Sequence, residues 1–180
     1  KKLFNNRTLS VLAASLISMD GLHLVHSRIA LLDIFLLFFI QIAVLAFLHS
    51  RYWLSALALG LACSVKWSGL YVLVALALYV LLTDFRRHRY LGAEHPIRKM
   101  LAKNFVFRFL QFGIFPTFIY FASWFSWFAS DKGWDRNFSS NPFFSLWHYH
   151  SQILNFHTNL RDSHPYSANP WSWLIQGRPT

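Results

Sequence analysis

A single lysine stands inside a long apolar stretch, and its position points to binding chemistry. Lys66 carries the only formal charge between Leu54 and Leu82. A lysine at the centre of a bilayer costs about 2.5–3.5 kcal/mol on insertion scales. Lys66 is therefore expected near a membrane face, next to Trp67, whose ring favours that depth. The simpler interpretation is a lysine at a helix end whose long stem lets the amine reach water.

A second group of charged residues precedes this stretch. Asp20 and Arg28 lie between the first two apolar segments, and Asp33 lies near the start of the second. If these side chains share a membrane face with Lys66, together they form a site for a charged lipid head group. Two simpler roles remain open. Arg28 and Asp33 could neutralise each other, or Asp33 could stabilise the positive N-terminal end of its helix.

The elements that must position these residues are membrane helices. The chain of 180 residues is 55% hydrophobic and 13% charged, whereas soluble domains carry roughly 25% charged residues. Apolar runs of membrane length therefore predict an all-α fold, a polytopic transmembrane helical bundle of about five spans. The expected spans are 8–26, 29–48, 52–65, 68–83 and 105–128. Ser64, Ser68 and Gly69 mark a helix break around Lys66, and Pro116 is expected to bend the last span.

The basic residues predict the orientation of the spans. The net charge is +10, and the 84–104 loop is rich in arginine and lysine, so we expect this loop in the cytoplasm. Alternation then places Lys66 and residues 129–180 on the outer, periplasmic face of the cell membrane. The positive charge is interpreted as a topology signal and as contact with anionic lipid, and no nucleic-acid partner is expected.

Neither a disulfide nor a metal centre is expected. Cys63 is the only cysteine. Four histidines of the C-terminal segment have a spacing that matches no standard zinc site: His148, His150, His157 and His164. No metal ligands are therefore assigned.

Three stretches together are similar to the protein O-mannosyltransferase family. The sequence DGLHLVHSRIALLD at 20–33 resembles one family motif, and SVKWSGLY at 64–71 resembles a second. The sequence HPYSANPWSWL at 164–174, followed by Arg178 and Pro179, is similar to the segment before the C-terminal spans of bacterial members. The three stretches occur in the family's order, and they cover most of the chain.

The resemblance implies a membrane glycosyltransferase of the GT-C type. Such an enzyme moves mannose from a polyprenyl-phosphate-mannose donor to Ser or Thr hydroxyls of exported proteins, on the outer face of the membrane. The short outer loop favours a bacterial, actinobacterial-type member. No cofactor is implied, because the lipid-linked mannose is a substrate. The family's catalytic acidic pair is expected upstream of Lys1, so the chain is expected to be an internal fragment that is inactive alone, with its catalytic residues unassigned.

The resemblance also gives the charged residues their expected roles. The polyprenyl phosphate leaving group gains charge as the sugar–phosphate bond breaks, so a cation aimed at it stabilises the transition state most. Backbone N–H groups at the break after Lys66 are expected to assist. The expected donor-binding residues are Lys66, Arg28, Asp33, Trp67 and Asp20. A lid or acceptor wall is expected from the tail, with an interfacial aromatic belt as the alternative: His164, Tyr166, Asn169, Trp171 and Arg178.

Three other functions remain as alternatives. A related GT-C transferase with a lipid or glycan acceptor would share the donor-side residues. Only an assay of the acceptor distinguishes it from a protein mannosyltransferase. A transporter of lipid-linked substrates predicts paired half-helices in two similar halves, and the sequence has no such repeat. A membrane scaffold without catalysis leaves the charges of Lys66, Arg28 and Asp33 without a role.

Overall fold

The computed structural model describes residues 5–21, 28, 31–160 and 171. Within these residues the regular structure is helical, without strands, in agreement with the predicted all-α class. The chain divides into two compact units, Lys1–Phe125 and Ser126–Thr180, and each is described by itself.

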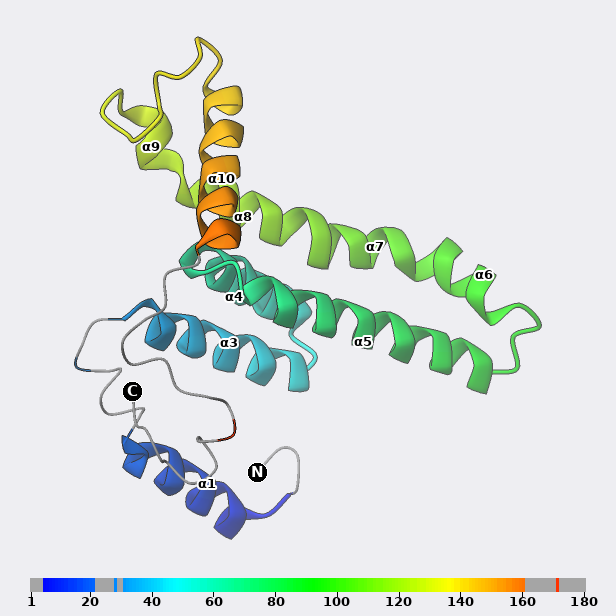
Figure 1. The fold of residues 1–180 in the computed structure, drawn as a ribbon. Helices are drawn as coiled ribbons and strands as arrows, with labels where there is room; N and C mark the ends of the chain where they lie inside the picture. The colour runs from blue at the N-terminus through cyan, green and yellow to red at the C-terminus, as the bar shows by residue number, and fades with distance from the viewer. Residues whose placement is uncertain (1–4, 22–27, 29–30, 161–170, 172–180) are drawn as a thin grey trace. The chain divides into compact units, whose positions relative to one another are not determined.

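The first unit contains separate helices followed by one long helical run (Figure 1). The separate helices are α1 (Arg7–Met19), α3 (Leu32–Leu48), α4 (Tyr52–Val65) and α5 (Gly69–Tyr90). The run comprises α6 (Pro96–Met100), the π-helical η1 (Leu101–Phe105), α7 (Val106–Phe109), the π-helical η2 (Leu110–Ile114) and α8 (Phe115–Ser123). A short helix, α9 (Phe125–Ala129), follows at the boundary between the units.

Helix α4 is the centre of the first unit, because it packs against α3, α5 and α8. Small side chains on α4 allow this close packing, as is typical of helix interfaces in membranes. Ala56 and Gly60 are four residues apart, and both are buried. A Cβ atom on Gly60 would lie 2.8 Å from Cβ of Ile119 and 3.0 Å from the carbonyl oxygen of Pro116. Glycine at position 60 therefore permits the close contact between α4 and α8.

Larger side chains fill the remaining core. Phe47 of α3 meets Tyr52, Tyr79 and Phe112 edge to face, with ring centroids 5.2, 5.8 and 6.2 Å apart. Edge-to-face contacts of this length add to the stabilisation that burial of the rings provides. These rings come from α3, α4, α5 and η2, so they join all four elements.

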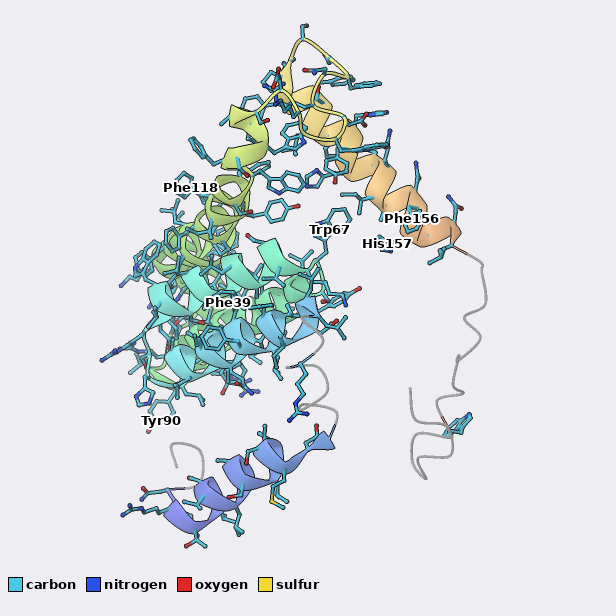
Figure 2. All side chains as sticks on the ribbon, turned by 90° about the vertical axis from the view of Figure 1, so that its left-hand side faces the viewer. Phe39, Trp67, Tyr90, Phe118, Phe156 and His157 are labelled. Carbon is cyan, nitrogen blue, oxygen red and sulfur yellow. The ribbon has the colours of Figure 1, made fainter. Side chains whose placement is uncertain are left out.

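The outward faces of these helices are apolar. Figure 2 shows side chains projecting from the helices, among them Phe118, which is 64% exposed. Among the described residues, Gly69–Tyr90 and Pro96–Ser123 are long and apolar enough to cross a membrane, whereas α1, α3 and α4 are shorter apolar helices. Exposed apolar helix surfaces agree with lipid as the surrounding solvent.

The helix ends differ from the predicted ones in several places. α5 continues to Tyr90, and the next helix begins at Pro96, so most of the expected 84–104 loop is helical. The first helix ends at Met19, and residues 22–27 of the expected 8–26 span lie outside the described residues. The 129–180 segment contains an 18-residue helix, α10 (Pro142–Asn159), where we expected only loop.

Local signals explain two of these differences. α5 is terminated two residues after Tyr90 by Gly92, whose φ of 71° suits glycine. The N–H groups of Gly92 and Ala93 bond the carbonyls of Arg89 and His88, which is the Schellman pattern of helix termination. α10 starts where the side chain of Asn141 accepts from the N–H of Phe143, with Pro142 at the first helical position, a favoured combination at helix starts.

In the second unit, α10 is joined to the segment before it through His148. Nδ1 of His148 lies 2.7 Å from Oδ2 of Asp135, and its ring stacks on Phe138 with centroids 3.6 Å apart. These two contacts hold residues 135–138 against the middle of α10.

Candidate functional site

The site is built on the three-residue turn between α4 and α5, which consists of Lys66, Trp67 and Ser68. α4 ends at Val65 because Lys66 adopts an extended conformation, with φ −156° and ψ 137°. The chain then turns, and α5 begins at Gly69. A Cβ atom on Gly69 would lie 2.8 Å from the carbonyl carbon of Ala62. Only glycine allows α5 to start this close to the last turn of α4, so the turn keeps Lys66 at the end of the hairpin.

Lys66 reaches across to the first turn of α3. Its Nζ donates to Oδ1 of Asp33 at 2.8 Å, and the two side chains are 48% and 43% exposed. Asp33 is the acidic residue in the first turn of α3, where a carboxylate also favours the positive end of the helix. An ion pair this exposed contributes about 0–1 kcal/mol to stability. The pair therefore fixes the direction of Lys66 while leaving the ammonium group open to another anion.

Trp67 ties the same turn to α8. Its indole Nε1–H donates to Oη of Tyr120 at 3.1 Å, and Trp67 is 39% exposed. The turn is thus attached on two sides, to α3 through Lys66 and to α8 through Trp67. Figure 2 labels Trp67 at this position. A lysine with its own side chain paired and the next residue hydrogen-bonded has less freedom to move, which favours binding of an anion at a fixed place.

Backbone N–H groups after the turn were expected to bind the donor phosphate, but they have other partners. The N–H groups of Gly69, Leu70 and Tyr71 bond the carbonyl oxygens of Lys66, Trp67 and Ser68 at 2.9–3.2 Å. These three N–H groups close the turn, so they do not serve the phosphate as expected. The positive charge at the site comes from the Lys66 side chain.

Asp20 and Arg28 are the other charged residues predicted for the donor site. Asp20 caps the C-terminal end of α1, where its N–H bonds the carbonyl of Ile17. Arg28 is exposed. Asp33 pairs with Lys66, a partner that sequence reasoning did not name.

Most of the predicted lid lies outside the described residues. This applies to His164, Tyr166, Asn169 and Arg178. Trp171 is described and is 79% exposed. Among the described residues, no three His, Cys, Asp or Glu side chains are placed to hold a metal ion.

Sequence reasoning missed two polar features. The first is the hydrogen bond of Tyr120: a tyrosine hydroxyl in an apolar span needs a partner, and this requirement was the signal available in the sequence. The second feature joins α5 to the long helical run. Nε of Arg108 donates to Oδ2 of Asp84 at 2.8 Å, and one turn further His88 Nε2 lies 3.0 Å from Oδ1 of Asn104.

Residues 1–129 match the family described as dolichyl-phosphate-mannose-protein mannosyltransferase. The chain belongs to this family. The resemblance that the motifs predicted is thereby confirmed, and the matched region includes Asp33, Lys66, Trp67 and Tyr120.

Bacterial relatives of this family cover the chain almost completely. A polyprenol-phosphate-mannose--protein mannosyltransferase of Mycolicibacterium smegmatis is 30% identical over 99% of this chain and 44% of its own length. Proteins with the same name from Corynebacterium glutamicum and Mycobacterium tuberculosis are 29% and 27% identical, over 99% of this chain and 44% and 43% of their own lengths. The chain thus spans less than half the length of these relatives. No solved structure matches it significantly.

Proposed function

We propose that the protein containing this chain is a membrane mannosyltransferase that moves mannose from polyprenyl-phosphate-mannose to hydroxyls of exported proteins. Family membership and the names of the relatives support this function. The observation that carries it is the position of Lys66, whose exposed ammonium group is held at a helix break by Asp33. We propose no cofactor, because the lipid-linked mannose is itself the activated substrate.

Lys66 binds the phosphate of the donor in this proposal. During transfer, the bond between the sugar C1 and the phosphate oxygen breaks, and a bond forms from C1 to the acceptor oxygen. The acceptor hydroxyl gives its proton to a base that the described residues do not identify. Negative charge grows on the departing phosphate, so a cation close to that oxygen is more favourable in the transition state than in the ground state.

Asp33 and Tyr120 act as positioning residues in this proposal. Asp33 lies 2.8 Å from Nζ of Lys66 and directs the ammonium group when no donor is bound. Oη of Tyr120 accepts a hydrogen bond from Nε1 of Trp67, the residue after Lys66, at 3.1 Å. Both contacts limit the reorganisation that Lys66 undergoes when a phosphate arrives, and a preorganised charge stabilises a transition state best.

Helix α5 supports an outer-face location for this site. Its 22 residues span about 33 Å at about 1.5 Å per residue, close to the thickness of the hydrocarbon layer. Lys66 precedes one end of α5, and the arginines before Tyr90 lie at the other (Figure 1). Because basic segments favour the cytoplasm, we propose that the protein is multi-pass with Lys66 on the outer face. The tail from His164 to Arg178 stays a proposed lid over it.

Transfer by the full-length enzyme tests the role of Lys66. We expect Lys66→Ala to lower transfer from polyprenyl-phosphate-mannose to an acceptor peptide by at least about tenfold, or about 1.4 kcal/mol in the barrier. Lys132→Ala removes an exposed lysine elsewhere and is the matched control. Wild-type transfer by a well-expressed Lys66→Ala enzyme contradicts the phosphate role. Mannose recovered only on lipid or glycan, and never on peptide, favours the related transferase instead.

A further inference from the structure

A pocket lies where the two membrane-length helices meet at the end far from Lys66. It has a volume of about 840 Å³, and its lining comes from the last turns of α5, the connecting segment and α6. Arg89, His95 and Arg98 contribute positive or polar groups, Glu94 contributes a carboxylate, and Phe85 and Leu101 contribute apolar surface. This volume falls in the range of ligand-binding pockets, about 300–1,000 Å³.

The shape of the pocket is fixed by the end of α5. Gly92, with φ 71°, lets the chain reverse, and Ala93 N–H bonds the carbonyl of His88 at 3.2 Å. The next helix starts at once with Pro96 at its first position, where proline is favoured. Arg89 before the reversal and Arg98 after it are therefore brought to the same pocket.

The surroundings of the pocket are strongly positive. Within residues 84–104, all of which the structure describes, the exposed cations are Arg86, Arg87, Arg89, Arg98, Lys99 and Lys103. Asp84 is buried and paired with Arg108, which leaves Glu94 as the exposed carboxylate of this segment. These charges would attract a negative ligand from solution, and Arg89 and Arg98, whose side chains are well suited to bind phosphate, both line the pocket.

The pocket lies where the head groups of a bilayer would be if the two long apolar helices cross it. It joins the ends of Gly69–Tyr90 and Pro96–Ser123, the two helices of membrane length. Ile97 and Leu101, which line it, are 59% and 46% exposed. A ligand here meets cations and exposed aliphatic surface together, which matches the phosphate and the first methylene groups of a phospholipid. A small soluble phosphate uses only the cations.

We propose that this pocket binds the head group of one anionic phospholipid, with Arg89 and Arg98 on the phosphate. Phe85, Ile97 and Leu101 contact the glycerol and the start of the acyl chains. The site is separate from the mannose donor site, at the opposite end of α5, and its occupancy does not depend on transfer activity.

Native mass spectrometry of the full-length protein in mild detergent tests the proposal, with phosphatidylglycerol added as the anionic lipid and phosphatidylcholine as the zwitterionic one. We expect one phosphatidylglycerol molecule to be retained. Arg89 and Arg98 line the pocket, so Arg89→Gln with Arg98→Gln removes two charge-assisted contacts to the phosphate, and we expect retention to fall by at least about tenfold. The matched control, Arg86→Gln with Arg87→Gln, removes the same charge from the same helix end outside the pocket lining. Solvent and salt screen charges that do not contact the phosphate, and we expect a change within about twofold.

Three results overturn the proposal. Equal loss in both double variants means diffuse attraction without a site. Equal retention of phosphatidylcholine means that the anionic charge is not recognised. Full displacement of the lipid by equimolar glycerol phosphate means a site for soluble phosphate. Glu94→Gln gives an independent check because it removes the pocket's carboxylate; we expect retention to rise by about twofold or more, and a fall contradicts the assignment. Both arginine variants must elute as the wild type does in size-exclusion chromatography.

Discussion

Asp84 and Arg108 form a buried ion pair between α5 and α7. Nε of Arg108 lies 2.8 Å from one carboxylate oxygen of Asp84, and Nη2 lies 3.4 Å from the other. The side chains are only 8% and 13% exposed. Nη1 of Arg108 also donates to Oε1 of Gln111 at 2.9 Å, and the guanidinium lies 4.7 Å from the ring centroid of Tyr52. The guanidinium therefore has partners on α5, η2 and α4.

Removing one partner of this pair should be costly. We expect Asp84→Ala to lower the free energy of unfolding by about 3–5 kcal/mol, because Arg108 is left as an uncompensated buried charge. Thermal unfolding of the purified full-length protein measures the loss. Adding Arg108→Met to Asp84→Ala should recover most of it, and equal instability of the single and double variants contradicts this account.

Loss of the hydrogen bond between Trp67 and Tyr120 should lower stability less than loss of the ion pair. Tyr120→Phe removes the hydroxyl that accepts from the indole, and we expect a stability loss of about 0.5–1.5 kcal/mol. We also expect a lower kcat for mannosyl transfer, because the turn that carries Lys66 loses one of its two attachments. The control is Tyr79→Phe, at a side chain that is 57% exposed. If both variants behave alike in transfer assays, the positioning role of Tyr120 is wrong.

Gly60 tests the contact between α4 and α8. An added methyl group would meet Cβ of Ile119 at 2.8 Å, and neither that atom nor the nearby Pro116 carbonyl can move without its helix. We expect Gly60→Ala to cost about 1–3 kcal/mol of stability. Gly21→Ala is the steric control, since no atom lies within 4 Å of its Cβ position. We expect the melting temperature of Gly60→Ala to fall below that of Gly21→Ala. Equal melting temperatures contradict a close contact between α4 and α8 at Gly60.

Cysteine labelling tests the proposed orientation. In a Cys63→Ser background, Glu94→Cys should be protected from a membrane-impermeant maleimide in intact cells, and Lys132→Cys should react. Both original side chains are exposed, so accessibility within the protein does not limit the reaction. Labelling at position 94 but not at position 132 reverses the orientation and moves Lys66 to the cytoplasmic face.

The sequence predicted the helix break at Lys66 because a charge, two serines and a glycine interrupt an apolar run. It also placed Lys66 and Asp33 in one site, since both interrupt apolar segments. It did not give the ion pair between them, because pairing depends on how α3 packs beside the α4–α5 hairpin. The same limit applies to Trp67 and Tyr120, which are 53 residues apart.

Helix ends were harder to predict where polar residues continue a helix. Residues 84–90 are rich in arginine, a pattern typical of a loop next to a membrane, and yet α5 includes them. Asp84 is neutralised by Arg108 from another element, and the sequence does not reveal this pairing. Gly92 was the local signal for the true end of α5, and Asn141 with Pro142 was the signal for α10.

The length of α4 has a consequence for the membrane around the site. Its 14 residues rise about 21 Å at about 1.5 Å per residue, whereas the hydrocarbon layer is about 30 Å thick. A bilayer accommodates such hydrophobic mismatch by thinning locally, and long flanking side chains extend toward the interface. Lys66 is the flanking residue at one end of α4. The leaflet is therefore expected to dip there, which brings phosphate groups of surrounding lipids down to the ammonium group.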